Sequence, residues 1–324
     1  MSSLPPPDLS VIIVSYRVRD VLCDCLQSLY AGEGLSGVSA QVIVVDNASG
    51  DGTADAVRTR FPQVEVIALT ENRGFAGGNN IGLSAATGRN LLLLNPDTLV
   101  PNGTLSQCVR YLDNSPADVG AMGCRVSGTD GNVQWECARR AVTPNDEITR
   151  AFLLDRVFFR SETFNRERMP GWNRSDERDV ESLLGAFMLV RRAAYETIGG
   201  LDERFFLMYE DTDYCTRLRD AGYRIRYFPG ASITHLGGSS WKQEKVLTYT
   251  NSHVAALQYM EKHFPRDAAR VRWAHRAGMT LKAALIRLAL LRSPGNADLH
   301  ERLRMVNTAR VALAGSPNPE RSPA

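Results

Sequence analysis

The chain has 324 residues, of which 44% are hydrophobic and 23% are charged, and its formal net charge is +2. This composition is that of a globular protein, and the length suits one large α/β domain with an appendage, or two domains. The balanced charge excludes an overall nucleic-acid-binding signature. Six cysteines without zinc-ligand spacing, an N-terminus without an apolar signal segment, and no long uncharged apolar run predict a cytoplasmic protein without a membrane span.

Short apolar runs alternate with amphipathic segments in the N-terminal third of the chain. Strands are expected at residues 10–16, 41–47, 64–69 and 90–95. Helices are expected between and after them, at residues 20–30, 53–61, 78–86 and 104–113. This alternation predicts a parallel sheet with crossover helices on both faces, and ligands of such sheets bind beyond the carboxyl ends of the strands.

The rest of the chain is less regular. We expect a strand at 119–126, a buried strand at 182–190, a short helix at 191–200, a helix at 211–221, and two strands joined by a turn within 223–237. Residues 145–180 are charged, aromatic and aperiodic, which predicts a long loop over a site. Residues 266–292 hold seven Lys/Arg and one acid around a leucine stripe. The last ten residues are predicted to be disordered.

Polar, glycine-rich segments follow three of the expected strands. They are DNASGDG at 46–52, ENRGFAGGNNIG at 71–82 and LNPDTLVP at 94–101. Carboxylates there can bind a ribose, a base or a cation, and glycines let the backbone approach a phosphate. Ordinary βα turns, close packing of a helix on the sheet, or an Asx cap at Asp97 explain the same residues without a ligand.

An acidic cluster follows an apolar run in FFLMYEDTDYC, residues 205–215. Glu210, Asp211 and Asp213 stand at the predicted start of a helix, where the helix dipole favours anions. The cluster is either a catalytic acidic pair or an N-terminal cap of an amphipathic helix. Asp213 is expected to support the first helical turn or to pair with Arg217.

Seven segments in this order resemble the family-two inverting glycosyltransferases with a GT-A fold, and are most similar to the bacterial rhamnosyltransferase branch. The segments are VIIVSY, VIVVDNASGDGT, NRGFAGGNNIG, LLLLNPDT, LLGAFMLVRR, FFLMYEDTDYCTRL and ITHLGGSS, which span residues 10–240. The resemblance implies a Rossmann-like mixed sheet flanked by helices, with a C-terminal helical appendage. It implies a catalytic domain at 8–262, a basic helical extension at 263–314 and a tail at 315–324.

The resemblance also implies the roles of individual residues. Asp211 is expected to be the general base, with Glu210 as its acidic partner, and Asp97 and His235 are expected to hold a divalent metal, Mg²⁺ or Mn²⁺. The donor pocket is expected to include Ser15, Asp46, Asn47, Asp51, Gly74, Asn79, Asn95 and Asp97. The usual metal motif of the family has an acid at both ends, whereas this chain has Asn95-Pro96-Asp97, so one negative charge is missing.

The implied reaction is transfer of a sugar, with rhamnose from dTDP-rhamnose as the best match, to a glycan or lipid-linked saccharide. A carboxylate base and one cation suffice for a single displacement with inversion. A nucleotide-sugar-binding module without turnover is the non-enzymatic alternative. A sugar-phosphate nucleotidyltransferase is disfavoured, because SYRVRD after the first strand contains no glycine. Residues 266–292 are expected to contact the catalytic domain, a second subunit, or anionic lipid at the inner face of the plasma membrane.

Overall fold

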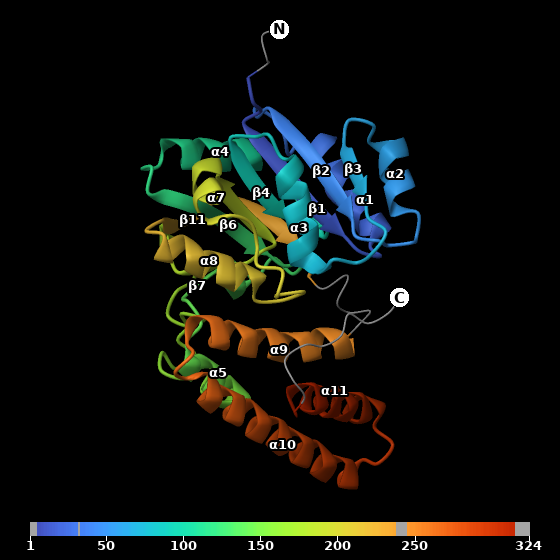
Figure 1. Ribbon diagram of the computed structural model, residues 1–324, viewed down its shortest axis with the longest axis vertical. Helices are drawn as coiled ribbons and strands as arrows, with labels where there is room; N and C mark the ends of the chain where they lie inside the picture. The colour runs from blue at the N-terminus through green and yellow to red at the C-terminus, as the bar shows by residue number, and fades with distance from the viewer. Residues whose placement is uncertain (1–4, 32, 238–244, 315–324) are drawn as a thin grey trace. The chain divides into compact units, whose positions relative to one another are not determined.

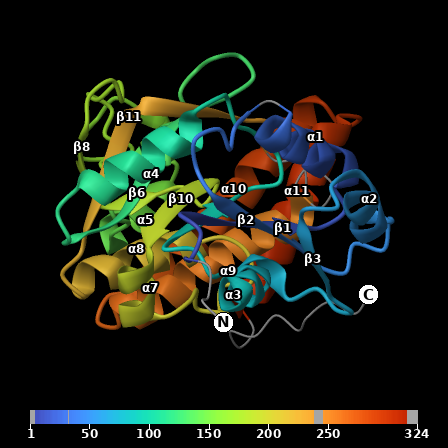
Figure 2. The ribbon, with the colours of Figure 1, turned by 90° about the horizontal axis from the view of Figure 1, so that it is seen from above.

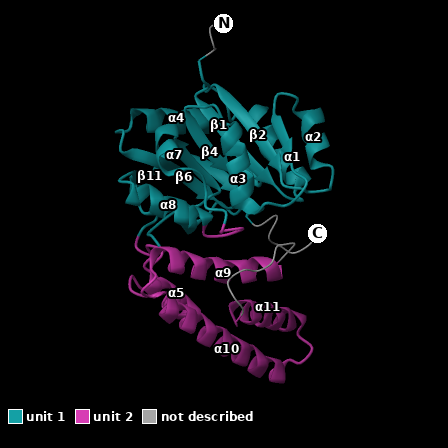
Figure 3. Cartoon of the chain, in the orientation of Figure 1, with its two compact units in different colours: residues 1–141, 172–203, 210–240 teal, residues 142–171, 204–209, 241–324 magenta. Residues whose placement is uncertain are grey.

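The structure is a computed structural model that describes residues 5–31, 33–237 and 245–314. The chain forms two compact units, drawn in two colours in Figure 3. Unit 1 comprises residues 1–141, 172–203 and 210–240, and unit 2 comprises residues 142–171, 204–209 and 241–324. Within the described ranges, the helices are all too short or too polar to cross a bilayer. The tail predicted at 315–324 lies outside the described residues.

Unit 1 is built on a mixed sheet, labelled in Figure 1, in which nine described strands take part. The strand order is β3-β2-β1-β4-β10-β6-β11-β5, and β8 pairs with β11. β1, β2, β3 and β4 are mutually parallel, β10 runs antiparallel to β4 and β6, and β11 runs parallel to β6. The bounds are β1 Leu9–Ser15, β2 Ala40–Asp46, β3 Glu65–Ala68, β4 Asn90–Leu94, β5 Thr98–Leu99, β6 Val119–Ser127, β8 Arg178–Val180, β10 Phe187–Arg191 and β11 Arg224–His235. β7 (Ala138–Arg139) and β9 (Ser182–Leu183) form a separate two-stranded sheet.

Helices cover both faces of this sheet. Figure 2 shows α1 and α4 on one side and α3 and α7 on the other. The bounds are α1 Arg19–Tyr30, α2 Thr53–Arg60, α3 Gly74–Ala85, α4 Thr104–Asn114, α7 Arg192–Ile198 and α8 Glu210–Asp220, with a 3₁₀ turn at Trp135–Cys137. Two glycines of α3 are required by close packing, since a Cβ at Gly78 or Gly82 would lie within 2.7 Å of a methyl carbon of Val14 or Ile12. For these two glycines, helix–sheet packing is therefore the explanation that the structure supports.

Three of the expected elements differ from those observed. The strand expected at 182–190 is two strands, β9 and β10, separated by residues 184–186. The expected strand–turn–strand at 223–237 is one strand, β11, which absorbs its proline and glycine as an irregularity between Phe228 and Ser232. α3 begins at Gly74, four residues before the expected start.

The long loop expected at 145–180 is also wrong, because this segment contains helices and a strand. α5 (Pro144–Ala151) begins with a capping box in which the Thr143 hydroxyl accepts from the amide of Asp146 and the Asp146 carboxylate accepts from the amide of Thr143. α6 (Leu154–Val157) follows, and β8 closes the segment. The signal was present in the sequence as TPND, with proline at the first helical position.

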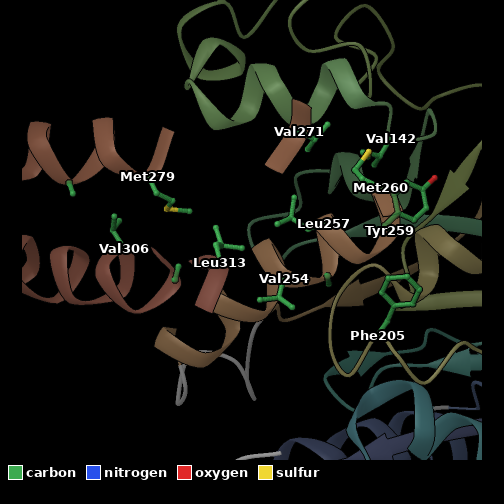
Figure 4. Packing of buried hydrophobic residues seen from close by; sticks show 13 residues of the cluster. Val142, Phe205, Val254, Leu257, Tyr259, Met260, Val271, Met279, Val306 and Leu313 are labelled. Atoms are coloured by element: carbon green, nitrogen blue, oxygen red, sulfur yellow. The ribbon is translucent and has the colours of Figure 1, made fainter. Parts of the chain in front are cut away.

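Unit 2 has its own apolar core. Its long helices are α9 (Lys245–His263), α10 (Ala268–Arg292) and α11 (Ala297–Ala314). Figure 4 shows side chains of these helices converging, and the buried cluster also includes one residue before α5 and one from the segment 204–209. Its larger members are Val142, Phe205, Val254, Leu257, Tyr259, Met260, Val271, Met279, Val306 and Leu313. Unit 2 therefore folds around contacts between segments that are distant in the sequence.

A buried polar network in unit 2 holds Tyr209, the residue that precedes α8. Its hydroxyl donates to Glu147 and accepts from Arg150, and Nε2 of His275 lies 2.9 Å from the other Glu147 oxygen. Burial alone raises the pKa of Glu147, but the charge of Arg150 and the contact with His275 outweigh it and lower the pKa to about 2. Met208 and Tyr209 both have positive φ, 72° and 68°, so the network holds a strained entry into α8.

The packing of α10 on α5 predicts that Gly278→Ala destabilises the protein. An added Cβ would lie 2.2 Å from the carbonyl oxygen of Ala151, so one of the two helices must shift. We expect a loss of about 1–3 kcal/mol in the free energy of unfolding, measured by urea denaturation. Gly295→Ala is the matched control, because a Cβ there meets no atom within 4 Å. Equal urea midpoints for the two variants would contradict this packing.

Candidate active site

The strand directions bring most of the predicted site residues to one edge of the unit 1 sheet. Ser15 and Asp46 are paired at the carboxyl ends of β1 and β2. Asp97 follows β4, which is parallel to β1, and His235 ends β11, where it pairs with Thr98. All four residues are buried, although each lies beside a turn or strand end. The sequence prediction that the strand ends share one site is thus consistent with the topology.

Asp211 is fixed at the same edge by four hydrogen bonds. Oδ1 accepts from the Arg139 guanidinium at 3.2 Å, from the Thr212 amide at 2.6 Å and from the Thr212 hydroxyl at 3.1 Å. Oδ2 accepts from the amide of Gly185 at 3.1 Å. The next residue, Ala186, accepts from the amide of Asn95 at 3.1 Å, which ties this segment to the end of β4. Among the described residues, Oδ2 accepts one bond and therefore keeps capacity for another.

Glu210 differs from Asp211 in its environment. Burial, and then the neighbouring charge of Asp211, raise the pKa of Glu210 to about 8, while Arg139 acts in the opposite direction. Glu210 therefore carries a proton at neutral pH. A carboxyl group that keeps its proton can donate a hydrogen bond, which an ionised carboxylate cannot.

Asp97, His235 and Asn95 form a second polar cluster. Nε2 of His235 lies 3.2 Å from Oδ1 of Asp97 and 3.3 Å from Nδ2 of Asn95. In the described part of the chain, no group of three or more His, Cys, Asp or Glu side chains is placed to hold a metal ion. A carboxylate, an imidazole nitrogen and an amide oxygen nevertheless make a donor set that suits Mg²⁺ or Mn²⁺ when waters and phosphate oxygens complete the coordination.

The remaining predicted donor-pocket residues make local hydrogen bonds. The Asn47 side chain donates to the carbonyl of Gly74 at 3.0 Å and accepts from the amide of Arg73 at 2.8 Å, so it joins the end of β2 to the glycine-rich turn. Asp51 is exposed and its carboxylate caps α2 by accepting from the amide of Thr53 at 3.0 Å. Asn79 is buried within α3 and donates to the carbonyl of Phe75 at 2.9 Å.

Three buried polar atoms in this region have no hydrogen-bond partner among the described residues. They are Oγ of Ser15, Oδ1 of Asn95 and Oε2 of Glu210. Unpaired buried polar atoms are costly, so native structures keep few of them. Three such atoms on residues that the sequence had already singled out are consistent with a site whose ligand supplies the missing partners.

Two polar residues of the site were not identified from the sequence. Arg139 bonds Asp211 and Thr212, and Gln134 bonds the side chain and the carbonyl of His235. Both come from the segment between β6 and β9, where the regular alternation had ended. A buried acidic pair requires a neighbouring positive charge, but the sequence alone does not identify the arginine that provides it. The alternative role of Asp213 is confirmed, since it pairs with Arg217 at 2.8 Å.

Comparison with known proteins decides the family. The model of the family described as "Glycosyltransferase like family 2" matches residues 5–248. The chain belongs to this family. It is 28% identical over 279 residues to an N-acetylglucosaminyl-diphospho-decaprenol L-rhamnosyltransferase of Mycobacterium tuberculosis, which covers 78% of this chain and 85% of that protein. It is 25% identical over 169 residues to the rhamnosyltransferase WbbL of Escherichia coli, covering 50% and 60% of the two chains.

A solved structure supports the same fold. A mannosyltransferase from Pyrobaculum calidifontis, in complex with GDP-Man and Mn²⁺, matches with a TM-score of 0.52 at 21% identity, covering 96% of this chain and 86% of that one. The predicted GT-A fold, a mixed α/β sheet flanked by helices with a C-terminal helical region, is confirmed. The chain is therefore a family-two glycosyltransferase.

The environment of Glu210 predicts a pH dependence of stability. Its pKa is raised from 4.5 to about 8, so between these values the folded protein holds a proton that the unfolded chain releases. The free energy of unfolding should then fall as pH rises, by at most about 1.4 kcal/mol per unit from this group. Glu210→Gln should remove this contribution, so the stability of the variant relative to the native protein should grow from pH about 5 to pH about 8.

Urea denaturation across this pH range measures the difference. Glu196→Gln is the control, because Glu196 is an exposed carboxyl group on α7 of the same unit. Its profile should run parallel to that of the native protein. Parallel profiles for Glu210→Gln would mean that Glu210 is ionised in the folded state.

Proposed function

We propose that this protein is an inverting glycosyltransferase that transfers rhamnose from dTDP-rhamnose to a saccharide carried on a polyprenyl diphosphate. The support for this sugar and acceptor class is the similarity to the N-acetylglucosaminyl-diphospho-decaprenol L-rhamnosyltransferase, which extends over most of both chains. The reaction would serve cell-envelope polysaccharide synthesis, at the cytoplasmic face of the membrane.

In this proposal Asp211 is the general base. An acceptor hydroxyl approaches Oδ2, gives up its proton to it, and forms a bond to the anomeric carbon while the nucleoside diphosphate leaves from the opposite face of the sugar. The observation that carries the proposal is the fixed Asp211 carboxylate, whose Oδ1 holds three hydrogen bonds while Oδ2 holds one. Glu210, protonated at neutral pH, would donate a hydrogen bond from the first turn of α8.

The donor would lie along the strand ends. Ser15 and Asp46 on neighbouring strands would contact the nucleoside, and Asp51, Asn79 and the glycine-rich turn, which Asn47 holds in place at Gly74, would border it. The unpartnered Oγ of Ser15 supports this placement, since a ribose or base would supply a hydrogen bond to it.

Asp97 and His235, with Asn95, would hold a divalent cation beside the diphosphate. The unpartnered Oδ1 of Asn95 and the proximity of the other two side chains support this assignment. When bound, such a cation offsets the negative charge that develops on the leaving group. The missing acid at residue 95 leaves the protein fewer charged ligands, so phosphate oxygens of the donor must contribute to the coordination.

The proposed base predicts the effect of Asp211→Asn. The amide has no basicity, so the turnover number should fall by about 10²- to 10⁴-fold while the affinity for dTDP-rhamnose is retained. Transfer to a lipid-linked N-acetylglucosamine acceptor and donor binding by calorimetry are the two measurements. Asp220→Asn, at the exposed end of the same helix, is the matched control and should retain activity. Undiminished transfer by Asp211→Asn would exclude it as the base, and no turnover by the native protein would favour a binding module.

We further propose that the exposed face of α10 binds an anionic membrane surface. Trp273, Leu281, Leu285, Leu288 and Leu291 are 41–79% exposed on this helix. Residues 268–292 contain six Lys/Arg and no Asp or Glu. Apolar side chains flanked by cations match the interface of a bilayer with anionic headgroups, whereas the same face of a second copy would present like charges.

Sedimentation with vesicles tests this surface. The native protein should bind vesicles rich in phosphatidylglycerol and not vesicles of phosphatidylcholine, and added salt should weaken binding. Leu285→Glu with Leu288→Glu should abolish it, whereas Val311→Glu, at a 74% exposed position on α11, should not. The face would instead belong to a subunit interface if the native protein is a dimer that does not bind vesicles and the double variant is a monomer.

A further inference from the structure

Both polar atoms of the Gln134 side-chain amide contact His235. Nε2 of Gln134 donates to the backbone carbonyl of His235 at 3.0 Å, and Oε1 lies 2.8 Å from Nδ1 of the same imidazole. Gln134 itself is anchored by its backbone, whose amide donates to the carbonyl of Val126 at 2.9 Å at the end of β6. The turn between them is closed separately, by the amide of Gly128 donating to the carbonyl of Asn132. The side chain of Gln134 is thus not needed to close the turn.

These contacts determine which imidazole nitrogen carries the proton. The carbonyl of residue 235 can only accept, so the NH₂ group of Gln134 must face it and Oε1 must face Nδ1. Oε1 can also only accept, so Nδ1 must carry a hydrogen. In the neutral imidazole the other nitrogen, Nε2, then has a free lone pair.

The contact of Nε2 with Asn95 agrees with this assignment. Nδ2 of Asn95 lies 3.3 Å away and donates to it, which turns Oδ1 of Asn95 away and accounts for the missing partner of that oxygen. Oδ1 of Asp97 lies 3.2 Å from the same nitrogen, and with Nε2 unprotonated these two acceptor atoms need a cation between them. The lone pair of Nε2 therefore lies beside the Asp97 carboxylate.

We propose that Gln134 is a positioning residue that fixes His235 as the Nδ1-protonated tautomer and so keeps Nε2 available as a ligand nitrogen. The fixed tautomer follows from the hydrogen bonds alone. Its use for a cation rests on the proposed function, in which Asp97 and His235 hold a divalent metal. Without Gln134, the hydrogen can move from Nδ1 to Nε2 and form a hydrogen bond to Asp97. That bond would engage both proposed metal ligands, the His235 nitrogen and the Asp97 carboxylate.

The test compares one substitution that removes the polar atoms with one that keeps the length of the side chain and an acceptor. Gln134→Leu removes both hydrogen bonds, whereas Gln134→Glu keeps an acceptor for Nδ1. A two-bond ¹H–¹⁵N spectrum of metal-free, histidine-labelled protein at mildly alkaline pH reports the tautomer, and His235→Gln identifies the signal among the five histidines. We expect protonated Nδ1 in the native protein and in Gln134→Glu, and loss of this preference in Gln134→Leu. Protonated Nε2 in the native protein, or an unchanged signal in Gln134→Leu, would overturn the proposal.

Mn²⁺ titration without donor gives a second readout. Gln134→Leu should bind Mn²⁺ about 10- to 100-fold more weakly than the native protein, and Gln134→Glu should recover most of the loss. If Gln134→Leu changes the tautomer but not the affinity for Mn²⁺, the ligand role of Nε2 is wrong. If the native protein shows protonated Nδ1 but binds no Mn²⁺, the metal proposal fails and the positioning role of Gln134 stands.

Discussion

The contact between Arg139 and Asp211 is the constraint on which the arrangement of the site depends. A buried carboxylate without partners is strongly disfavoured, and Asp211 avoids that cost because a guanidinium, a backbone amide and a helix N-terminus all meet it. These donors come from β7, from the segment before β10 and from α8. Three parts of the chain that are far apart in sequence must therefore converge before residue 211 has its position.

The two adjacent acids differ in their surroundings. Arg139 lies against Asp211, and Glu210 is left buried with a raised pKa and an unpartnered oxygen. One carboxyl group is thus fixed as an acceptor while its neighbour keeps a proton at neutral pH. Gln134 acts comparably at the other cluster, where a neutral amide decides the protonated nitrogen of His235. In both cases a residue outside the recognised motifs positions a residue within them.

The sequence predicted the first four strands and their helices to within a few residues, because each has a strong local signal. Continuous β-branched or leucine runs and helical spacing do not depend on distant contacts. The errors lie where tertiary contacts decide. Pro229 and Gly230 suggested a turn, yet pairing with β6 keeps β11 as one strand. Helix α5 is an exception, because its start is marked by a local signal, the capping box of Thr143 and Asp146, that the prediction did not use. Arg139 and Gln134 could not be found, because their partners are 72 and 101 residues away.

The stereochemistry of transfer tests the central claim most directly, because a fixed carboxylate that only removes a proton requires a single displacement. The anomeric configuration of the first product formed from dTDP-rhamnose can be read by NMR before any equilibration. This account predicts a configuration opposite to that of the donor. A product that retains the donor's configuration would contradict it, since retention by this site would require two displacements and a covalent intermediate.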